Sequence, residues 1–133
     1  MPSCTALIQI GTNRLDAVGI DRSRHHARLI LCHLAGCRIE DMIAFPERFD
    51  VDEQAFYRLI DRCAAGEPIS RIRGTKEFYG RDFYISPAVL DPRPESETLI
   101  DVAKAEFSKD AALNILEIGV GSGALICTLL LEF

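Results

Sequence analysis

Three glycines set between two apolar runs constrain the fold of this chain more than any other feature. Residues 114–118, Asn-Ile-Leu-Glu-Ile, predict a buried strand, and the apolar run that begins at Ala124 predicts a helix. Gly119, Gly121 and Gly123 allow positive φ angles and let main-chain N–H groups approach a ligand closely. Because a helix N-terminus carries partial positive charge, this turn suits a carboxylate or a phosphate. The pattern indicates the first strand, turn and helix of a parallel α/β sheet.

The spacing of these glycines leaves two classes of cofactor open. The same stretch fits Gly-x-Gly-x-x-Ala, a permitted form of the dinucleotide fingerprint. Glu117 favours S-adenosyl-L-methionine, because a carboxylate at the strand end attracts the cationic methionine end of that cofactor and repels a pyrophosphate. The alternative for Glu117 is a solvated carboxylate with no ligand role. Both cofactors call for an acidic residue about 20 positions further on, and the 133 residues end before that position.

Residues 1–73 predict a small bundle of short helices. Apolar residues recur at helical spacing, capping residues precede them, and glycine or proline follows them. We expect a helix near 50–65 that begins at Asp50 with Glu53 in the capping-box position and ends before Gly66. The other expected helices cover about 5–18, a segment around 27–34 that stops at Gly36, and about 39–45 before Pro46.

A different pattern begins near Gly74. Two aromatic runs around Gly80-Arg-Asp82 predict a β-hairpin within 76–86, which either packs the domains together or contacts a substrate. Pro92 and Pro94 stiffen the chain, and Pro94 can open a helix over 95–107. That helix has an apolar stripe, made of Leu99, Val102, Ala103 and Phe107. The expected fold class is therefore α/β overall, with a helical bundle, a hairpin linker and the truncated start of a Rossmann-like domain.

Charge and cysteine content narrow the function classes. The net charge is -5, and residues 1–75 balance ten arginines against ten acidic residues, so we expect no nucleic-acid partner. The five cysteines form no Cys-x-x-Cys pair, which predicts free thiols in a reducing cytoplasm and no metal site. The N-terminus lacks the features of a signal peptide, and no apolar run reaches the ~20 residues of a membrane helix. We expect a cytoplasmic monomer.

Several motifs form a wider pattern along the chain, in the stretches 66–74 (Gly-Glu-Pro-Ile-Ser-Arg-Ile-Arg-Gly), 77–80 (Glu-Phe-Tyr-Gly), Phe83, 87–99 with its Pro-Arg-Pro-Glu-Ser-Glu element, and 115–123. In their order and spacing, they resemble the glutamine N-methyltransferases of peptide chain release factors, the PrmC or HemK family. The resemblance implies three parts: a release-factor-docking domain over 1–73, a hairpin linker over 74–94, and the incomplete start of a methyltransferase domain over 95–133. It implies S-adenosyl-L-methionine as cofactor, and as substrate the glutamine amide of the Gly-Gly-Gln motif in release factors.

The resemblance also assigns residues. Those that match the cofactor loop are Gly119, Val120, Gly121, Ser122 and Gly123, with Glu117 before them. Those that match the linker element beside the active site are Leu90, Arg93, Glu95 and Glu97, for which a purely structural role is the equal alternative. No catalytic residue is assigned within the chain.

One family motif is missing. In the family, an Asn-Pro-Pro-Tyr motif grips the substrate amide, whereas Asn114 here is followed by Ile115. We therefore expect little or no activity from this polypeptide alone. The alternatives are a non-catalytic fragment that binds release factors, and a nicotinamide dehydrogenase that rests on the Gly-x-Gly-x-x-Ala match. We also expect 110–133 to be mobile or aggregation-prone, because a strand at 114–118 would have two unpaired edges.

Overall fold

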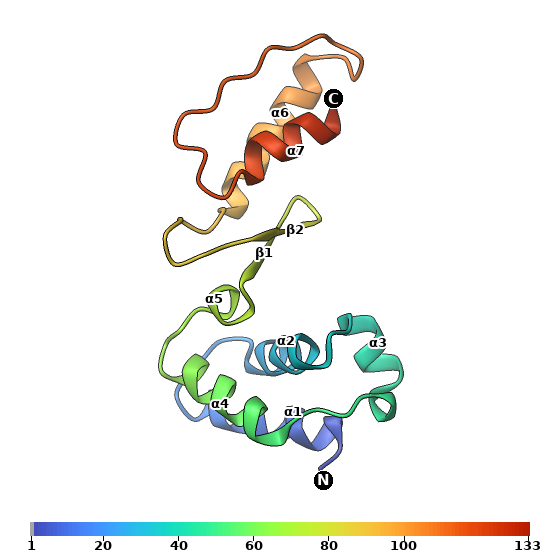
Figure 1. The fold of residues 1–133 in the computed structure, drawn as a ribbon, viewed down its shortest axis with the longest axis vertical. Coiled ribbons are helices and arrows are strands. Elements are labelled where there is room, and N and C mark those ends of the chain that lie inside the picture. The colour runs from blue at the N-terminus through green and yellow to red at the C-terminus, as the bar shows by residue number, and fades with distance from the viewer. Residues whose placement is uncertain (1) are drawn as a thin grey trace. The chain divides into compact units, whose positions relative to one another are not determined.

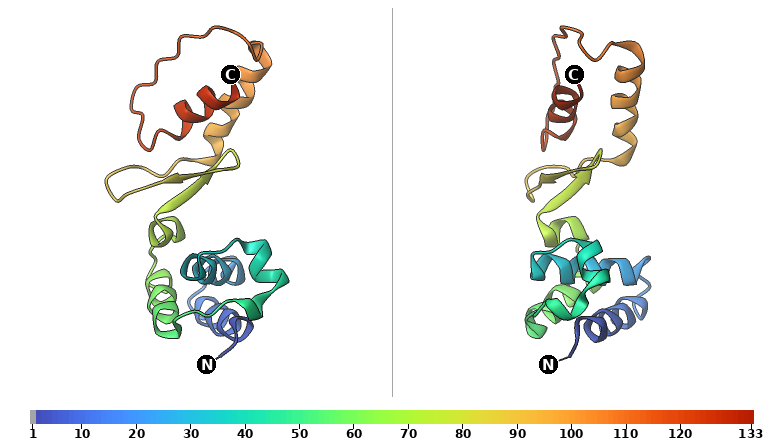
Figure 2. Two further views of the ribbon diagram at one scale, coloured as in Figure 1. Left: turned by 45° about the vertical axis from the view of Figure 1, so that its right-hand side comes forward. Right: turned by 90° about the vertical axis from the view of Figure 1, so that its right-hand side faces the viewer.

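The computed structural model describes residues 2–133, which form two compact units with their boundary in the sequence between Arg73 and Gly74. We call them the first unit and the second unit, and Figures 1 and 2 show the elements of each. The first unit is entirely helical, and its elements are α1 (Cys4–Asp16), α2 (Ser23–Ala35), α3 (Ile39–Ala44), the 3-10 turn η1 (Pro46–Arg48), α4 (Glu53–Ala64) and α5 (Ile69–Arg73). The predicted helical bundle is confirmed, and α5 is a short helix that the sequence pattern did not predict.

Local signals explain most of the helix ends in the first unit. The Ser3 hydroxyl accepts a hydrogen bond from the Ala6 N–H at the start of α1, and Gly36 ends α2 in the left-handed conformation. The predicted cap of α4 is wrong by two residues. Asp52, not Asp50, caps this helix, because its carboxylate accepts from the N–H groups of the second and third helical residues.

The core of the first unit is formed where α1, α2 and α4 pack on one another. Gly11 lies at this contact, where a Cβ atom would stand 2.8 Å from the ring of Phe56 and 3.0 Å from Ile60. The missing side chain therefore lets α1 approach α4 closely. The fully or almost fully buried residues of this core are Cys4, Leu7, Ile8, Leu15, Ala27, Ile30, Leu31, Cys32, Met42, Val51, Phe56, Ile60, Cys63 and Ile72.

The second unit combines a hairpin with two helices. Its elements are β1 (Thr75–Phe78), β2 (Arg81–Tyr84), the 3-10 turn η2 (Pro94–Ser96), α6 (Glu97–Glu106) and α7 (Ala124–Glu132). The hairpin is confirmed, but its turn lies one residue earlier than predicted. Tyr79 and Gly80 both have positive φ, as a two-residue type I′ turn requires, and Phe78 pairs with Arg81 across it.

The predicted strand at 114–118 is wrong. Residues 111–117 have no regular secondary structure, and β1 and β2 are the only strands among residues 2–133. A strand forms only when a neighbouring strand takes up its backbone hydrogen bonds. Leu116 and Ile118 are accordingly 87% and 91% exposed instead of buried. The α/β prediction is thus confirmed for the bundle and the hairpin, and no Rossmann-like sheet begins within the described residues.

The apolar stripe predicted for the helix at 95–107 is not the face that α6 buries. Leu99, Val102 and Phe107 are about half exposed, whereas Ile100 is fully buried with Phe78 and Ala124. The elements that cover α6 are the hairpin and α7, and they lie on the side of Ile100. The stripe would need a further layer of structure to bury it.

Three further properties concern the described residues as a whole. No helix among them is long and apolar enough to cross a membrane. None of the five cysteines forms a disulfide; three are buried, Cys37 is half-buried and Cys127 is exposed. In the part of the chain that the structure describes, no cluster of three or more His, Cys, Asp or Glu side chains could hold a metal ion.

Candidate functional site

The glycine turn adopts the backbone conformation that its sequence predicts. Gly119, Gly121 and Gly123 have φ values of 75°, 54° and 79°, and Gly123 is the residue that precedes α7. The Gly123 N–H donates to the carbonyl oxygen of Val120 at 2.8 Å, which closes the turn. A Cβ built on Gly119 would meet no other atom within 4 Å, so the space in front of the turn is open. The turn therefore leaves room for a ligand at the positive end of α7.

Glu117 lies at this positive end. One of its carboxylate oxygens accepts a hydrogen bond from the Ile126 N–H, in the first turn of α7, at 3.1 Å. Gly123 has no side chain to cap the helix, and Glu117 supplies that acceptor from nine residues away in sequence. The carboxylate is half-buried and keeps a second oxygen for another partner.

A cleft of about 170 Å³ brings the glycine turn and the proline-rich segment together. Its lining comes from both stretches and from the hairpin: Phe78, Leu90, Asp91, Pro92, Arg93, Ser96, Glu117, Gly119, Val120, Gly121, Ser122, Ala124 and Leu125. Leu90 and Arg93 thus line the same cleft as Glu117 and four of the five loop residues, whereas Gly123 is not part of the lining. The predicted domain bounds assign these two stretches to different parts of the chain, although the family resemblance sets the linker element beside the active site.

Two of the predicted linker residues do not line the cleft. Glu95 is exposed in η2. The Glu97 carboxylate accepts a hydrogen bond from the Tyr79 N–H at 2.8 Å and so supports the hairpin turn. Several residues that line the cleft were not predicted as site residues. Among them, Asp91 and Ser96 belong to the proline-rich stretch at 87–99, and nothing in the sequence marked Phe78 as a ligand contact.

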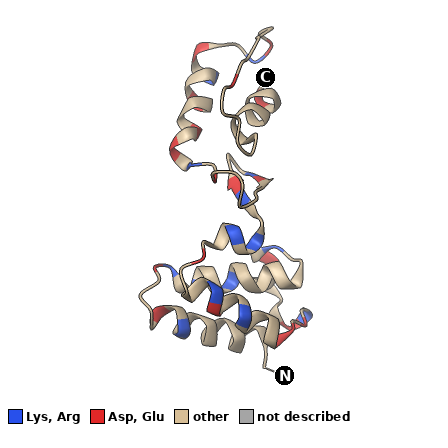
Figure 3. Ribbon diagram, turned by 60° about the vertical axis from the view of Figure 1, so that its left-hand side comes forward, with Lys and Arg blue, Asp and Glu red and all other residues tan. Residues whose placement is uncertain are grey.

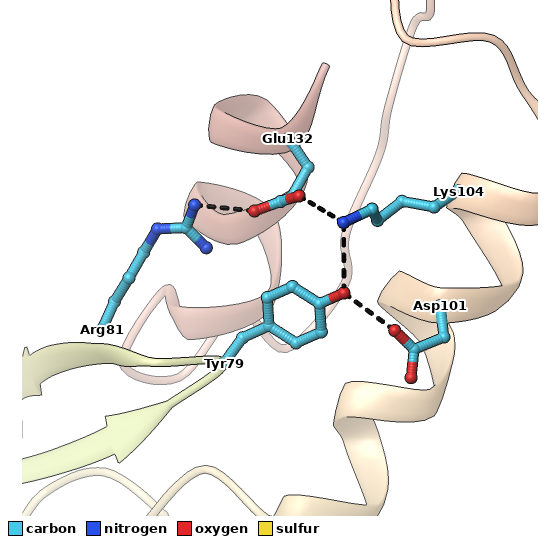
Figure 4. Close-up of polar contacts among 5 residues, drawn as sticks. All are labelled: Tyr79, Arg81, Asp101, Lys104 and Glu132. Carbon is cyan, nitrogen blue, oxygen red and sulfur yellow. Dashed lines mark hydrogen bonds and ion pairs between the residues drawn. The ribbon is translucent and has the colours of Figure 1, made fainter.

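A network of charged and polar side chains ties α7 to α6 and the hairpin (Figure 4). The Tyr79 hydroxyl donates to Asp101 at 2.8 Å and accepts from the Lys104 ammonium at 3.4 Å. Lys104 and Arg81 each donate to one oxygen of Glu132, both at 2.7 Å. The hydrogen bond to Lys104, with that to Arg81, holds the pKa of Glu132 below its usual value. The network anchors the end of α7 that is remote from the glycine turn.

The residues of the cleft fit the methionine end of S-adenosyl-L-methionine. That end carries an ammonium, which a carboxylate such as Glu117 attracts, and a carboxylate, which main-chain N–H groups at a helix start attract. The open space before Gly119 leaves the backbone accessible. The charge set suits a dinucleotide less well, because Glu117 would face a pyrophosphate.

Comparisons with known proteins identify the family of the chain. A family model described as the PrmC N-terminal domain matches residues 6–74. A release factor glutamine methyltransferase from Nitratidesulfovibrio vulgaris is 39% identical over 128 residues, which cover 95% of this chain and 43% of the relative. A release factor glutamine methyltransferase from Koribacter versatilis is 41% identical over 121 residues, which cover 90% of this chain and 43% of the relative. A bifunctional methyltransferase from Rickettsia prowazekii is 35% identical over 150 residues, covering 98% and 29%. The chain therefore spans less than half the length of these relatives.

Proposed function

This chain belongs to the PrmC family, and on that premise we propose that it contributes to S-adenosyl-L-methionine-dependent methylation of the glutamine amide in the Gly-Gly-Gln motif of release factors. In this proposal the first unit docks the release factor, and the second unit holds the methionine end of the cofactor. The observation that supports it most is the single cleft shared by the glycine turn, Glu117 and the proline-rich segment.

Catalysis of this methyl transfer depends more on the placement of the two reactants than on the acid or base strength of a side chain. An amide nitrogen is a weak nucleophile because its lone pair is delocalised into the carbonyl. When bound, S-adenosyl-L-methionine supplies a methyl group that its sulfonium already activates. The protein must then hold donor and acceptor in line. Glu117 and the N–H groups at the start of α7 would hold the donor, and Leu90 and Arg93 would border the acceptor side of the cleft.

The 133 residues alone are proposed to transfer little or no methyl group. They contain no Asn-Pro-Pro-Tyr stretch, which grips the substrate amide in the family that the sequence resembles. Without acceptors for the two amide hydrogens, the nitrogen would not be held in line with the methyl group.

The direct experiment is a methyl-transfer assay with radiolabelled cofactor and a purified release factor. We expect no transfer above background from the 133-residue chain, and robust incorporation would refute the proposed inactivity.

Calorimetric titration of the same chain separates the cofactors: we expect S-adenosyl-L-methionine to bind in preference to NAD. Preference for NAD would favour the dehydrogenase alternative. Gly119→Val should weaken cofactor binding, while Gly36→Val, an equally strained change in the first unit, should not.

A second candidate function is a release-factor-binding fragment without catalysis. The observation that favours it is the continuous core of the first unit, which is closed by its own helices. Binding to a purified release factor without affinity for S-adenosyl-L-methionine would select this alternative.

A further inference from the structure

A groove on the first unit has no part in the proposed methyl-transfer cleft. Its volume is about 180 Å³, and it lies between α1, α2 and the segment from α3 to Pro46. Ile8 and Met42 of the buried core line it, and Ile43, which is 56% exposed, supplies its exposed apolar surface. A cavity of about 150 Å³ can hold a benzene ring, so the groove has room for one apolar side chain.

The charged part of this groove has one sign. Arg24 and Arg28, one helical turn apart on α2, line it, and no carboxylate does. Figure 3 marks the basic and acidic residues along the helices of the first unit. Four arginines elsewhere in this unit have carboxylate partners: Arg14 pairs with Asp61, Arg38 with Glu40, Arg58 with Asp52 and Arg62 with Glu67.

The arginines of α2 are left without such partners. Within residues 2–133, neither Arg24 nor Arg28 forms an ion pair or a side-chain hydrogen bond, and Arg22, just before the helix, forms none either. The helix itself contains no acidic residue. Burial lowers the pKa of His25 on the same helix, and the positive charges of Arg22 and Arg28 lower it further. Among the described residues of the first unit, no carboxylate therefore forms an ion pair with these three arginines.

We propose that this groove docks an acidic segment of the protein substrate that inserts one apolar side chain between α1, α2 and α3. The inference rests on the proposed function, because it takes the release factor as that substrate. Arginine is enriched at protein–protein interfaces, and their fully buried centres are more apolar than the rest of the surface. Single-stranded nucleic acid, by contrast, is bound on aromatic side chains that stack with bases, and the groove lining has none.

The test is fluorescence anisotropy of a labelled, purified release factor titrated with the 133-residue chain. We expect Arg24→Glu and Arg28→Glu each to weaken binding about tenfold, as for charge pairs across protein interfaces. Ile43→Asp, which removes the apolar contact, should weaken binding similarly. The matched control is Arg58→Glu, an exposed reversal on α4 outside the groove lining, which should leave the affinity unchanged.

The Arg24→Glu variant separates lost binding from misfolding. It lies in the first turn of α2, where a glutamate is favoured by the helix dipole, so Arg24→Glu should keep the circular dichroism of the parent chain. If the parent chain and all groove variants bind the release factor equally well, the groove inference is overturned while the proposed function stands. If the parent chain does not bind it at all, both are overturned. Displacement of the release factor by a labelled oligouridine that needs Arg24 and Arg28 would also overturn the inference, in favour of RNA.

Discussion

At the scale of single residues, three carboxylates hold backbone N–H groups that their local structure leaves unpaired. Asp52 serves the start of α4, Glu97 serves the hairpin turn and Glu117 serves the start of α7. Buried or half-buried N–H groups need such acceptors. Two of these three residues, Glu97 and Glu117, are also predicted site residues, so their substitution would change stability as well as any binding.

The cap of α4 gives the first prediction. Asp52→Ala should lower the free energy of unfolding of the first unit by about 1 kcal/mol, the usual value for loss of a helix cap. Asp50→Ala should change it by less than about 0.5 kcal/mol, as surface substitutions usually do. Urea unfolding followed by circular dichroism measures both. A larger effect at Asp50 than at Asp52 would show that the helix begins earlier.

Histidines give the second prediction, which concerns pH. The pKa values of His25, His26 and His33 lie below their ordinary value of 6.5, mainly because of burial, and the positive charge of nearby arginines adds to it. The unfolded chain thus binds protons at a higher pH than the folded chain does. The free energy of unfolding therefore keeps its full value above pH 6.5. It decreases as the pH falls through the lowered pKa values of the three histidines. The hydrogen bond from Arg62 lowers the pKa of Glu67 from its ordinary value of 4.5, so this carboxylate changes the stability only below pH 4.5.

Unfolding in urea at pH 7.5 and at pH 5.5 measures this loss. His25→Gln should reduce the difference between the two pH values, because it removes one of the groups whose protonation opposes folding. An unchanged difference would mean that His25 titrates alike in both states.

At the scale of elements, the first unit depends on the close contact of α1 with α4 at Gly11. Gly11→Val would place methyl groups where Phe56, Ile60 and Ala27 already lie. We expect the free energy of unfolding to fall by about 1–3 kcal/mol, the range for overpacked cores. The control is Gln9→Val on the exposed side of α1, which should change it by no more than about 0.5 kcal/mol. If the two substitutions change the free energy of unfolding equally, helix propensity and not packing determines the effect at Gly11.

The second unit depends on the network around Glu132, whose side chain is only 16% exposed (Figure 4). Glu132→Gln removes the charge that both Arg81 and Lys104 contact, so the end of α7 should loosen. We expect faster hydrogen exchange of the α7 amides, measured by mass spectrometry. Glu106→Gln, an exposed change at the end of α6, should leave that exchange unaltered. Protection of α7 that survives Glu132→Gln would assign its anchoring to apolar contacts alone.

At the scale of the whole molecule, the two units differ in how much apolar surface they bury. The first unit has a continuous core, whereas Phe78, Ile100 and Ala124 alone form the buried cluster of the second. Much apolar surface of the second unit stays exposed, including Leu116 and Ile118. Exposed apolar patches of this kind favour association.

The segment at 114–118 therefore gives a prediction for the behaviour of the chain in solution. The double change Leu116→Lys and Ile118→Lys should reduce concentration-dependent light scattering, because it replaces exposed apolar side chains by charged ones. Lys substitutions at the exposed polar positions Gln9 and Asn13 serve as the control and should not reduce it. Scattering that persists after the change at 116 and 118 would locate the association elsewhere.

The candidate site could be predicted only in part from the sequence. The conformation of the glycine turn follows from the glycines themselves, since positive φ is a local property. That Leu90 and Arg93 share a cleft with this turn depends on how η2 and α7 pack. Only the family resemblance pointed to it, because neither stretch by itself contains that information. The role of each predicted site residue stays a prediction.

The sequence by itself determined the helices of the first unit, the hairpin and the glycine turn, because caps, helical periodicity and turn residues act over a few neighbours. Tertiary structure alone decided that 114–118 remains without a strand partner, that α6 buries Ile100, and that Glu117 caps α7. It also decided which arginines pair with carboxylates and which, such as Arg24 and Arg28 on α2, do not. These outcomes depend on groups that are distant in sequence, whose meeting is set by the packing of whole elements.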